Sequence, residues 1–142
     1  MHDETSKELR TTLTSAGKLE LSIVAVPMPK PGEGEVLVKV EASPINPSDL
    51  GLLLGPADVS SLSIAGSGDN TVASMDVPDA MMPAMQARLD AALPVGNEGA
   101  GVVIAAGAGA EHMVGKTIGV AGGAMYSQYR CVPAASCIVM NE

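Results

Sequence analysis

The stretch LPVGNEGAGVV, residues 93–103, determines how the rest of this sequence is interpreted. Its three glycines, Gly96, Gly99 and Gly101, allow another chain segment to approach closely or permit a positive φ at the entry to a strand. Glycines beside an acid, here Glu98, are typical of a loop that serves a metal site. Asn97, however, stands where a metal ligand would be expected. The loop therefore raises the question of whether it serves a metal at all.

The composition predicts one mostly β domain. A chain of 142 residues has the usual length of a single domain. It contains no Phe or Trp, two Tyr and nine Met, so its core must consist of aliphatic side chains with Met filling the gaps. Branched aliphatic residues favour strands, and the sixteen Gly and ten Pro indicate many turns.

The charge excludes several classes of partner. A nucleic-acid partner or an anionic membrane surface requires a basic patch, but the net charge is −8 and the eight Lys and Arg are scattered singly. The longest uncharged apolar run, residues 99–110, is too short to cross a bilayer, and the N-terminus MHDETSKELR is unlike a signal peptide. We expect a cytoplasmic protein in which Cys131 and Cys137 are buried free thiols.

Several segments around the quoted stretch predict strands. The segment EVLVKVEA, residues 35–42, is the clearest, because Val36, Val38 and Val40 share one of its faces. A hairpin is expected from residues 10–14 and 19–26, with a turn over residues 15–18. Further strands are expected over residues 99–106, 117–121, 126–133 and 136–140.

A helix start follows the clearest strand. Asn46 is a good N-cap, Pro47 fits the first helical position, and Asp49 lies near the positive end of the helix dipole. The leucines of residues 50–54 follow, and Gly55 can end the turn.

Residues 56–92 predict a small helical lobe inserted between these strands. Residues 56–78 show weak periodicity and predict a loop, whereas a helix is expected over residues 80–92. Met81, Met85 and Leu89 would share one face of that helix. We interpret this stripe as core packing, with a lid over an apolar substrate or a partner surface as the alternative. The sum is a mostly β domain with minor α, a closed or partly closed barrel with one inserted helical lobe.

Three segments together resemble a known family. They are VLVKVEASPINPSDL (36–50), LPVGNEGAGVV (93–103) and GKTIGVAGGAMYSQYRCVPA (115–134). In this order and spacing they resemble the N-terminal, GroES-like catalytic domain of the medium-chain dehydrogenase/reductase superfamily, in its zinc-free quinone and enone reductase branch. The resemblance implies a single GroES-like domain over residues 1–142, a partly closed β-barrel, with residues 56–92 as an insertion longer than the family usually carries.

The resemblance also addresses the metal. In zinc-dependent relatives a cysteine ligand matches Asn46 and a histidine ligand matches Asn97. Zinc binds thiolate, imidazole or carboxylate, and a neutral amide oxygen is a poor replacement. The family's structural zinc uses four cysteines between these motifs, and residues 51–130 contain none. We therefore expect no zinc, and we expect His2 and His112, which lie outside the motifs, to be solvated loop residues.

The resemblance implies roles for the residues of the first motif. Asn46 matches an asparagine that lines the nicotinamide and substrate cleft, so Asn46 and Pro47 are candidate cofactor contacts and Asn46 a candidate catalytic residue. Ser48 matches a hydroxyl that passes a proton in zinc-dependent relatives, although without zinc it could simply bond the helix backbone. Asp49 is interpreted as cap and dipole chemistry.

The other motifs supply three further candidates. Glu98 matches an acid behind the metal site, so Asn97 and Glu98 are given structural, supporting roles. If Glu98 is buried, it needs a donor partner or a raised pKa. Tyr126 and Tyr129 are expected to face opposite sides of one strand. Tyr126 is the candidate to donate to a substrate carbonyl, although a packed tyrosine bonded to a backbone group is the commoner outcome.

No dinucleotide fingerprint is present, because Gly107-Ala-Gly-Ala-Glu-His112 ends in His where a glycine is required. In the resembled family a Rossmann cofactor domain follows, so the chain is interpreted as the substrate half of an NADPH-dependent oxidoreductase, inactive without that domain. The implied substrate is a quinone or an α,β-unsaturated carbonyl. The full-length protein is expected to be a homodimer, and the isolated domain a monomer.

A rival interpretation keeps the barrel without catalysis. It is a stand-alone GroES-like binding or assembly module, in which the predicted loop over residues 56–78 would contact a protein partner. Fold alone does not distinguish the two functions.

Overall fold

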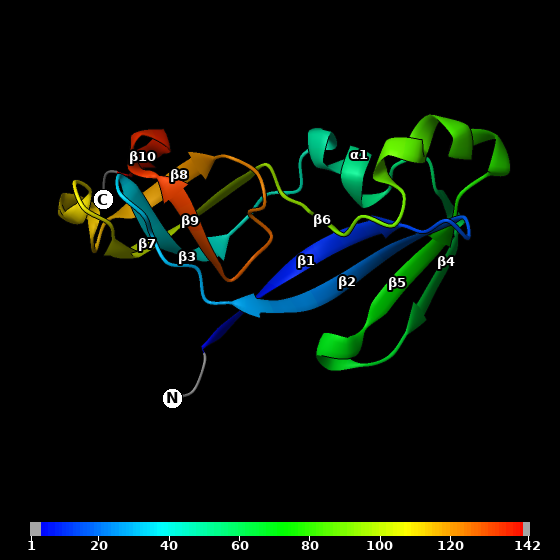
Figure 1. The fold of residues 1–142 in the computed structure, drawn as a ribbon, viewed down its shortest axis with the longest axis horizontal. Coiled ribbons are helices and arrows are strands. Elements are labelled where there is room, and N and C mark those ends of the chain that lie inside the picture. The colour runs from blue at the N-terminus through cyan, green and yellow to red at the C-terminus, as the bar shows by residue number, and fades with distance from the viewer. Residues whose placement is uncertain (1–3, 141–142) are drawn as a thin grey trace. The chain divides into compact units, whose positions relative to one another are not determined.

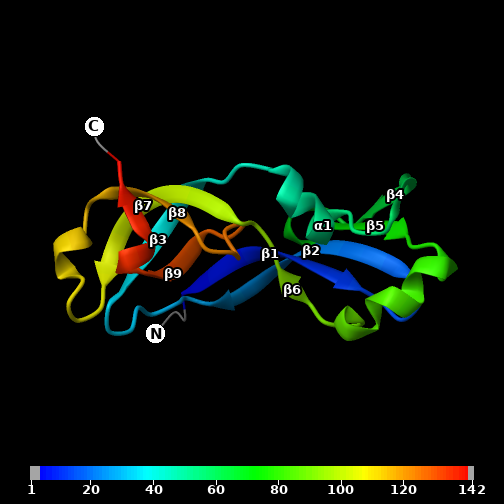
Figure 2. The same ribbon diagram turned by 90° about the horizontal axis from the view of Figure 1, so that it is seen from above.

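The computed structural model describes residues 4–140, which divide into two compact units. The first contains residues 4–8, 25–45 and 96–140, and the second contains residues 9–24 and 46–95. Both are built mainly from β-strands, as predicted (Figures 1 and 2). The strands form two antiparallel sheets, and neither sheet closes into a complete barrel within the described part of the chain.

The first unit holds the sheet that carries the quoted motif. Its five strands pair in the order β10-β8-β7-β3-β9. They are β3 (Glu35–Ala42), β7 (Glu98–Ala106), β8 (Thr117–Ala121), β9 (Tyr129–Pro133) and β10 (Cys137–Val139). These match the predicted strands, except that β9 begins three residues later than expected. Their inward-facing side chains form the core of this unit together with two methionines from connecting segments, Met113 and Met125. The strand residues of this core include Val36, Val38, Val103, Ile118, Val120 and Val132.

The burial along β3 differs from simple alternation. Val36 and Val38 are buried as predicted, but Leu37 between them is buried as well. The pairing of β3 with β7 shifts register between Leu37 and Val38. The extra residue of this bulge is Ile104 on β7, so β3 itself keeps its alternation, and Leu37 is buried on the face opposite to Val36 and Val38.

The second unit contains most of the other sheet, whose order is β4-β5-β2-β1-β6. The predicted hairpin is confirmed as β1 (Thr5–Leu13) and β2 (Lys18–Pro27), and β6 (Leu93–Pro94) pairs with β1. Leu13, Leu19, Met75 and Val77 form the core of this unit. Strand β1 begins in the first unit and ends in the second, and β2 begins in the second and ends in the first, so the chain passes between the units along both strands.

The loop predicted over residues 56–78 is wrong. This segment forms β4 (Asp58–Ala65) and β5 (Val72–Asp76), which extend the sheet outward from β2 (Figure 1). All but one residue of β4 is exposed. An alternating apolar pattern arises where one face of a strand is buried, and here both faces meet water. The strand therefore left only a weak periodic signal in the sequence, the alternation of Leu62 and Ile64 with serines.

The helix predicted over residues 80–92 is a 3₁₀ helix, Asp79–Arg88, rather than an α-helix. Pro83 lies inside it, and proline supplies no N–H for an α-helical hydrogen bond. Side chains three residues apart share a face of a 3₁₀ helix. Met82 and Met85 accordingly pack against the core together with Leu89, whereas Met81 is 41% exposed. The stripe thus packs as expected, but with Met82 in place of Met81.

Strand β7 approaches β3 unusually closely at Gly101. Gly101 pairs with Val40, and a Cβ built on Gly101 would lie 2.0 Å from the carbonyl oxygen of Lys39. No side chain fits at that distance. The last glycine of the quoted motif is therefore required by the sheet itself.

We expect Gly101→Ala to lower the free energy of unfolding by about 3 kcal/mol or more, because the strands must separate to admit a methyl group. Urea denaturation of the chain measures this loss. The matched control is Gly51→Ala, in the helix α1 (Leu50–Leu53), where an added Cβ meets nothing within 4 Å. That variant should be neutral or more stable by up to about 1 kcal/mol. Equal midpoints for the two variants would contradict the close approach at Gly101.

Candidate functional site

The turn at residues 46–49 is fixed by two reciprocal hydrogen bonds. The backbone N–H of Asn46 donates to Asp49 Oδ2 at 2.8 Å, and the backbone N–H of Asp49 donates to the carbonyl oxygen of Asn46 at 2.9 Å. Asn46 is the N-cap of the 3₁₀ turn Pro47–Asp49, as predicted, and α1 follows directly. Asp49 is only 2% exposed, so its carboxylate is committed to the turn. An acid in the first turn of a helix is also favoured by the helix dipole.

The other side chains of this turn meet solvent. Pro47 and Ser48 are exposed and Asn46 is half-buried. All three can therefore contact a molecule that approaches the turn from outside. The turn offers neutral polar groups, an amide and a hydroxyl, rather than a charge.

The quoted loop carries two of the candidate residues, Asn97 and Glu98. Both side chains are exposed. The carbonyl oxygen of Asn97 accepts a hydrogen bond from Gly122 N–H at 2.9 Å, which ties the loop to the chain after β8. The condition that Glu98 is buried is not met. Strand alternation turns Gly99 inward and its neighbour Glu98 outward, so the argument for a desolvated acid no longer applies.

Tyr126 lies before β9 rather than on it, so the expectation that both tyrosines share one strand is wrong. Gly123 and Ala124 adopt left-handed φ angles of 74° and 56°, which turn the chain before it joins the sheet at Tyr129. The phenol of Tyr126 donates to the carbonyl oxygen of Pro44 at 2.8 Å. The commoner outcome, a packed tyrosine bonded to the backbone, is the one observed.

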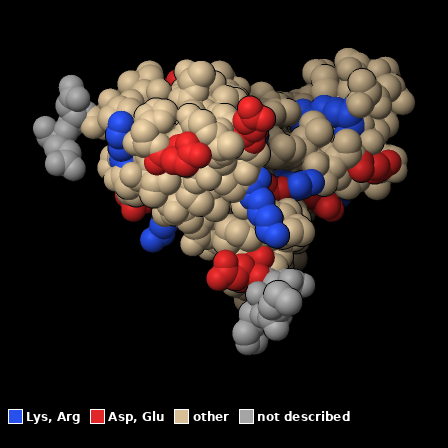
Figure 3. Space-filling model, turned by 60° about the vertical axis from the view of Figure 1, so that its left-hand side comes forward, with Lys and Arg blue, Asp and Glu red and all other residues tan. Residues whose placement is uncertain are grey.

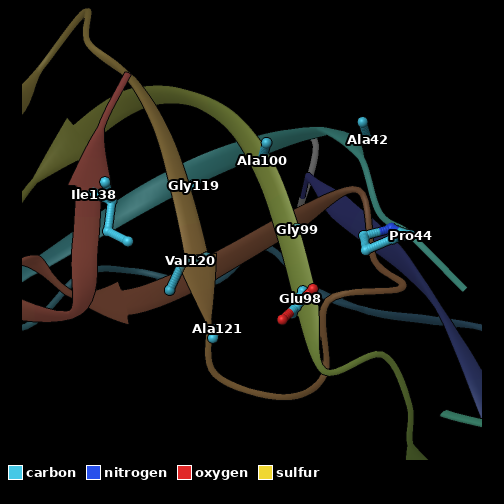
Figure 4. A pocket seen from close by; sticks show the side chains of 9 residues that line it. All are labelled: Ala42, Pro44, Glu98, Gly99, Ala100, Gly119, Val120, Ala121 and Ile138. Atoms are coloured by element: carbon cyan, nitrogen blue, oxygen red, sulfur yellow. The ribbon is translucent and has the colours of Figure 1, made fainter. Parts of the chain in front are cut away.

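A hollow of about 330 Å³ lies on the sheet of the first unit beside Glu98 (Figure 4). A row of paired residues crosses four strands there, namely Ala42, Ala100, Gly119 and Ile138. Glu98 and Ile138 are the longer side chains on either side of β8. Glu98 is the only predicted site residue that lines the hollow. The small side chains of the row were missed because they become neighbours only once the register is known.

The chemistry of the hollow is limited. Apart from Glu98 its lining side chains are apolar or absent, so no neutral donor points into it. It can hold an apolar group but offers nothing to polarise a carbonyl. The polar candidates instead lie on the turn 46–49 in the second unit, and on Asn97 and Tyr126 in the first.

The described residues offer no ready metal site. Over residues 4–140 no group of three or more His, Cys, Asp or Glu is placed to hold a metal ion. Asn46 and Asn97 would present neutral amide oxygens, which zinc binds poorly. His112 is exposed in a 3₁₀ turn, Glu111–Met113, whereas His2 lies outside the described residues. The donor set does not fit zinc.

Both cysteines are free and half-buried. Burial raises the pKa of the Cys131 thiol, with a further contribution from the nearby charge of Glu35, and burial also raises the pKa of the Cys137 thiol. A raised pKa keeps a thiol protonated and unreactive near neutral pH. Neither cysteine is a candidate nucleophile.

Charges of both signs are mixed on the surface. Lys and Arg side chains are interspersed with Asp and Glu over the face shown in Figure 3 rather than gathered in a basic patch. Within residues 4–140 no helix has the length and apolar character needed to span a bilayer.

Comparison with known proteins identifies the family. Residues 32–142 match the alcohol dehydrogenase GroES-like domain. A zinc-type alcohol dehydrogenase-like protein of Schizosaccharomyces pombe is 59% identical over 34 residues, which are 24% of this chain and 10% of that protein.

Solved structures share the fold. A candidate NADPH:quinone reductase from Mesorhizobium loti matches 97% of this chain and 37% of its own, with a TM-score of 0.58 and 23% identity. A mycobacterial protein complexed with NADPH matches 96% of this chain and 33% of its own, with a TM-score of 0.58 and 21% identity. This chain thus spans about a third of the length of these structures. It belongs to the alcohol dehydrogenase GroES-like domain family, as a domain of the medium-chain dehydrogenase/reductase type.

Proposed function

We propose that this chain is the substrate-side domain of a zinc-independent, NADPH-dependent oxidoreductase that reduces quinones or α,β-unsaturated carbonyls. The observation that carries the proposal is the capped turn at Asn46, whose amide stands where the resemblance implies a metal ligand in zinc-dependent relatives. The family match and the likeness to a quinone reductase fold support the reaction class. The rival binding module lost its main support when the predicted loop over residues 56–78 proved to be a strand hairpin.

The cofactor assignment rests on family and fold. One structure with this fold is an NADPH complex. NADPH, when bound, supplies the hydride, and a second domain would hold most of it. The exposed Pro47 and half-buried Asn46 are the candidate contacts from this chain.

Asn46 would act on the acceptor carbonyl. Its side-chain N–H₂ can donate to the carbonyl oxygen, where negative charge develops during reduction. The hydroxyl of the exposed Ser48, two residues further on, is a second donor on the same turn. Neutral donors stabilise such charge less than a metal ion does. They therefore suit an activated acceptor, such as a quinone or enone, better than a plain ketone.

Two supporting residues each hold their own segment in place. Asp49 fixes the backbone of Asn46 from a buried position, and Asn97 ties its loop to the chain after β8.

We propose a cytoplasmic enzyme that is a homodimer at full length, and a monomer as the isolated domain. Light scattering of both forms tests the oligomeric states.

Two substitutions at Asn46 distinguish its role as a helix cap from its proposed catalytic role. In the two-domain protein, Asn46→Ser keeps a good N-cap but removes the amide, whereas Asn46→Ala removes both. We expect both variants to lower kcat/KM for a quinone by about 100-fold. Only Asn46→Ala should also lower the free energy of unfolding, by about 1 kcal/mol. Wild-type kcat/KM in Asn46→Ser would remove Asn46 from the site, and Asn70→Ala, in an exposed turn, controls for loss of any asparagine.

Metal content gives an independent test of zinc independence. We expect the purified two-domain protein to contain far less than one zinc per chain, because amide oxygens are poor zinc ligands. Dialysis against a chelator should leave quinone reduction unchanged. One zinc per chain, with activity lost on chelation and restored by zinc, would overturn the proposal.

A further inference from the structure

The segment 122–126, between β8 and β9, is bonded to the chain that leads into Asn46. The phenol of Tyr126 donates to the carbonyl oxygen of Pro44 at 2.8 Å. The hydroxyl of Ser43 donates to the carbonyl oxygen of Met125 at 2.9 Å. The two residues that follow β3 by one and two positions, Ser43 and Pro44, are thus bonded to two consecutive residues of the segment, Met125 and Tyr126.

The same segment is bonded to the quoted loop. The backbone N–H of Met125 donates to the carbonyl oxygen of Gly96 at 3.0 Å. A Cβ built on Gly96 would lie 2.6 Å from the Tyr126 ring and 2.6 Å from its backbone nitrogen, and φ of Gly96 is +98°. Only glycine admits the ring in this position. The Tyr126 side chain therefore contacts one loop through its ring and the other through its hydroxyl.

Both contacts fall where the chain passes between the units. The chain leaves the first unit at Ile45 and returns to it at Gly96. Pro44, the acceptor of the phenol, is separated from Asn46 by one residue. A shift of the Pro44 carbonyl therefore moves the peptide plane that it shares with Ile45, and with it the backbone that enters the turn.

We propose that Tyr126 is a positioning residue that sets the entry to the Asn46 turn. We define the Tyr126 clamp as Ser43, Pro44, Gly96, Met125 and Tyr126. The phenol proton is directed at a backbone carbonyl, so Tyr126 acts through Asn46 rather than on substrate. The catalytic consequence rests on the proposed function, whereas the clamp itself rests on the contacts above.

The clamp is tested first in this chain without any activity. Tyr126→Phe removes the O–H but keeps the ring against Gly96, and Tyr129→Phe is the matched control on β9. In NMR spectra we expect Tyr126→Phe to shift the Pro44 carbonyl carbon and the Ile45 amide nitrogen, which share the peptide that accepts the bond. Amide exchange at Asn46 and Asp49 should rise about fivefold, since an exposed hydrogen bond is worth a fold-change of this order.

The control should leave these four signals in place. If Tyr126→Phe also leaves them unchanged, the clamp does not exist. Shifts of equal size in Tyr129→Phe would assign the effect to general loosening, and would equally overturn the proposal.

A double-mutant cycle in the two-domain protein tests the catalytic consequence. We expect Tyr126→Phe to lower kcat for quinone reduction about tenfold, because small misplacements of a catalytic group are costly. In the Asn46→Ala background the same change should have no further effect, because Tyr126 acts through Asn46. The pH dependence of kcat should keep its shape in Tyr126→Phe. An additive loss, or the loss of one limb of the pH profile, would instead make Tyr126 a catalytic residue in its own right.

The two experiments fail separately. If the two-domain protein reduces neither quinones nor enones, the proposed function is wrong, while the NMR comparison still decides whether the clamp exists. If activity is present and the cycle is additive, the proposed function stands and the positioning role is rejected.

Discussion

The absence of a side chain at two positions is the constraint on which the first unit depends. Gly101 lets β7 lie against the backbone of β3, and Gly96 admits the ring of Tyr126. Each glycine is explained by a neighbouring segment that a Cβ would displace. Two of the three glycines of the quoted loop therefore have a packing explanation that involves no metal.

The two charged candidate residues, Asp49 and Glu98, differ in where their carboxylates lie. The carboxylate of Asp49 is buried and bonded to the backbone of Asn46, whereas that of Glu98 is exposed on the outer face of β7. What remains on the exposed side of the turn is an amide and a hydroxyl. Neutral groups polarise a carbonyl without competing for a proton. This electrostatic character supports the electron-poor acceptor and the separate cofactor domain that we propose.

Strands with a buried face, and the turn that begins at the Asn46 cap, could be predicted from the sequence. The strand EVLVKVEA and the Asn46 cap carry local signals, an alternation and a residue type, that need no tertiary information. Strand β4 was not predicted because water contacts both of its faces. The 3₁₀ helix was predicted as an α-helix because the spacing of its methionines suggested one, although Pro83 disfavours it. The exposure of Glu98 and the bond from Tyr126 to Pro44 depend on register and on distant segments. No local pattern encodes them.

The framework of the candidate site is separate from the side chains that would do chemistry. The bonds described at both turns engage backbone groups, namely the N–H and carbonyl of Asn46 and the carbonyl of Asn97. Such bonds form whatever side chain the residue carries, apart from proline at a donor position. These backbone bonds therefore tolerate a change of side chain, although Asn46 also adds a side-chain cap of its own. Because the backbone bonds remain when the side chain changes, one fold can carry different side chains, and so different functions, at these positions.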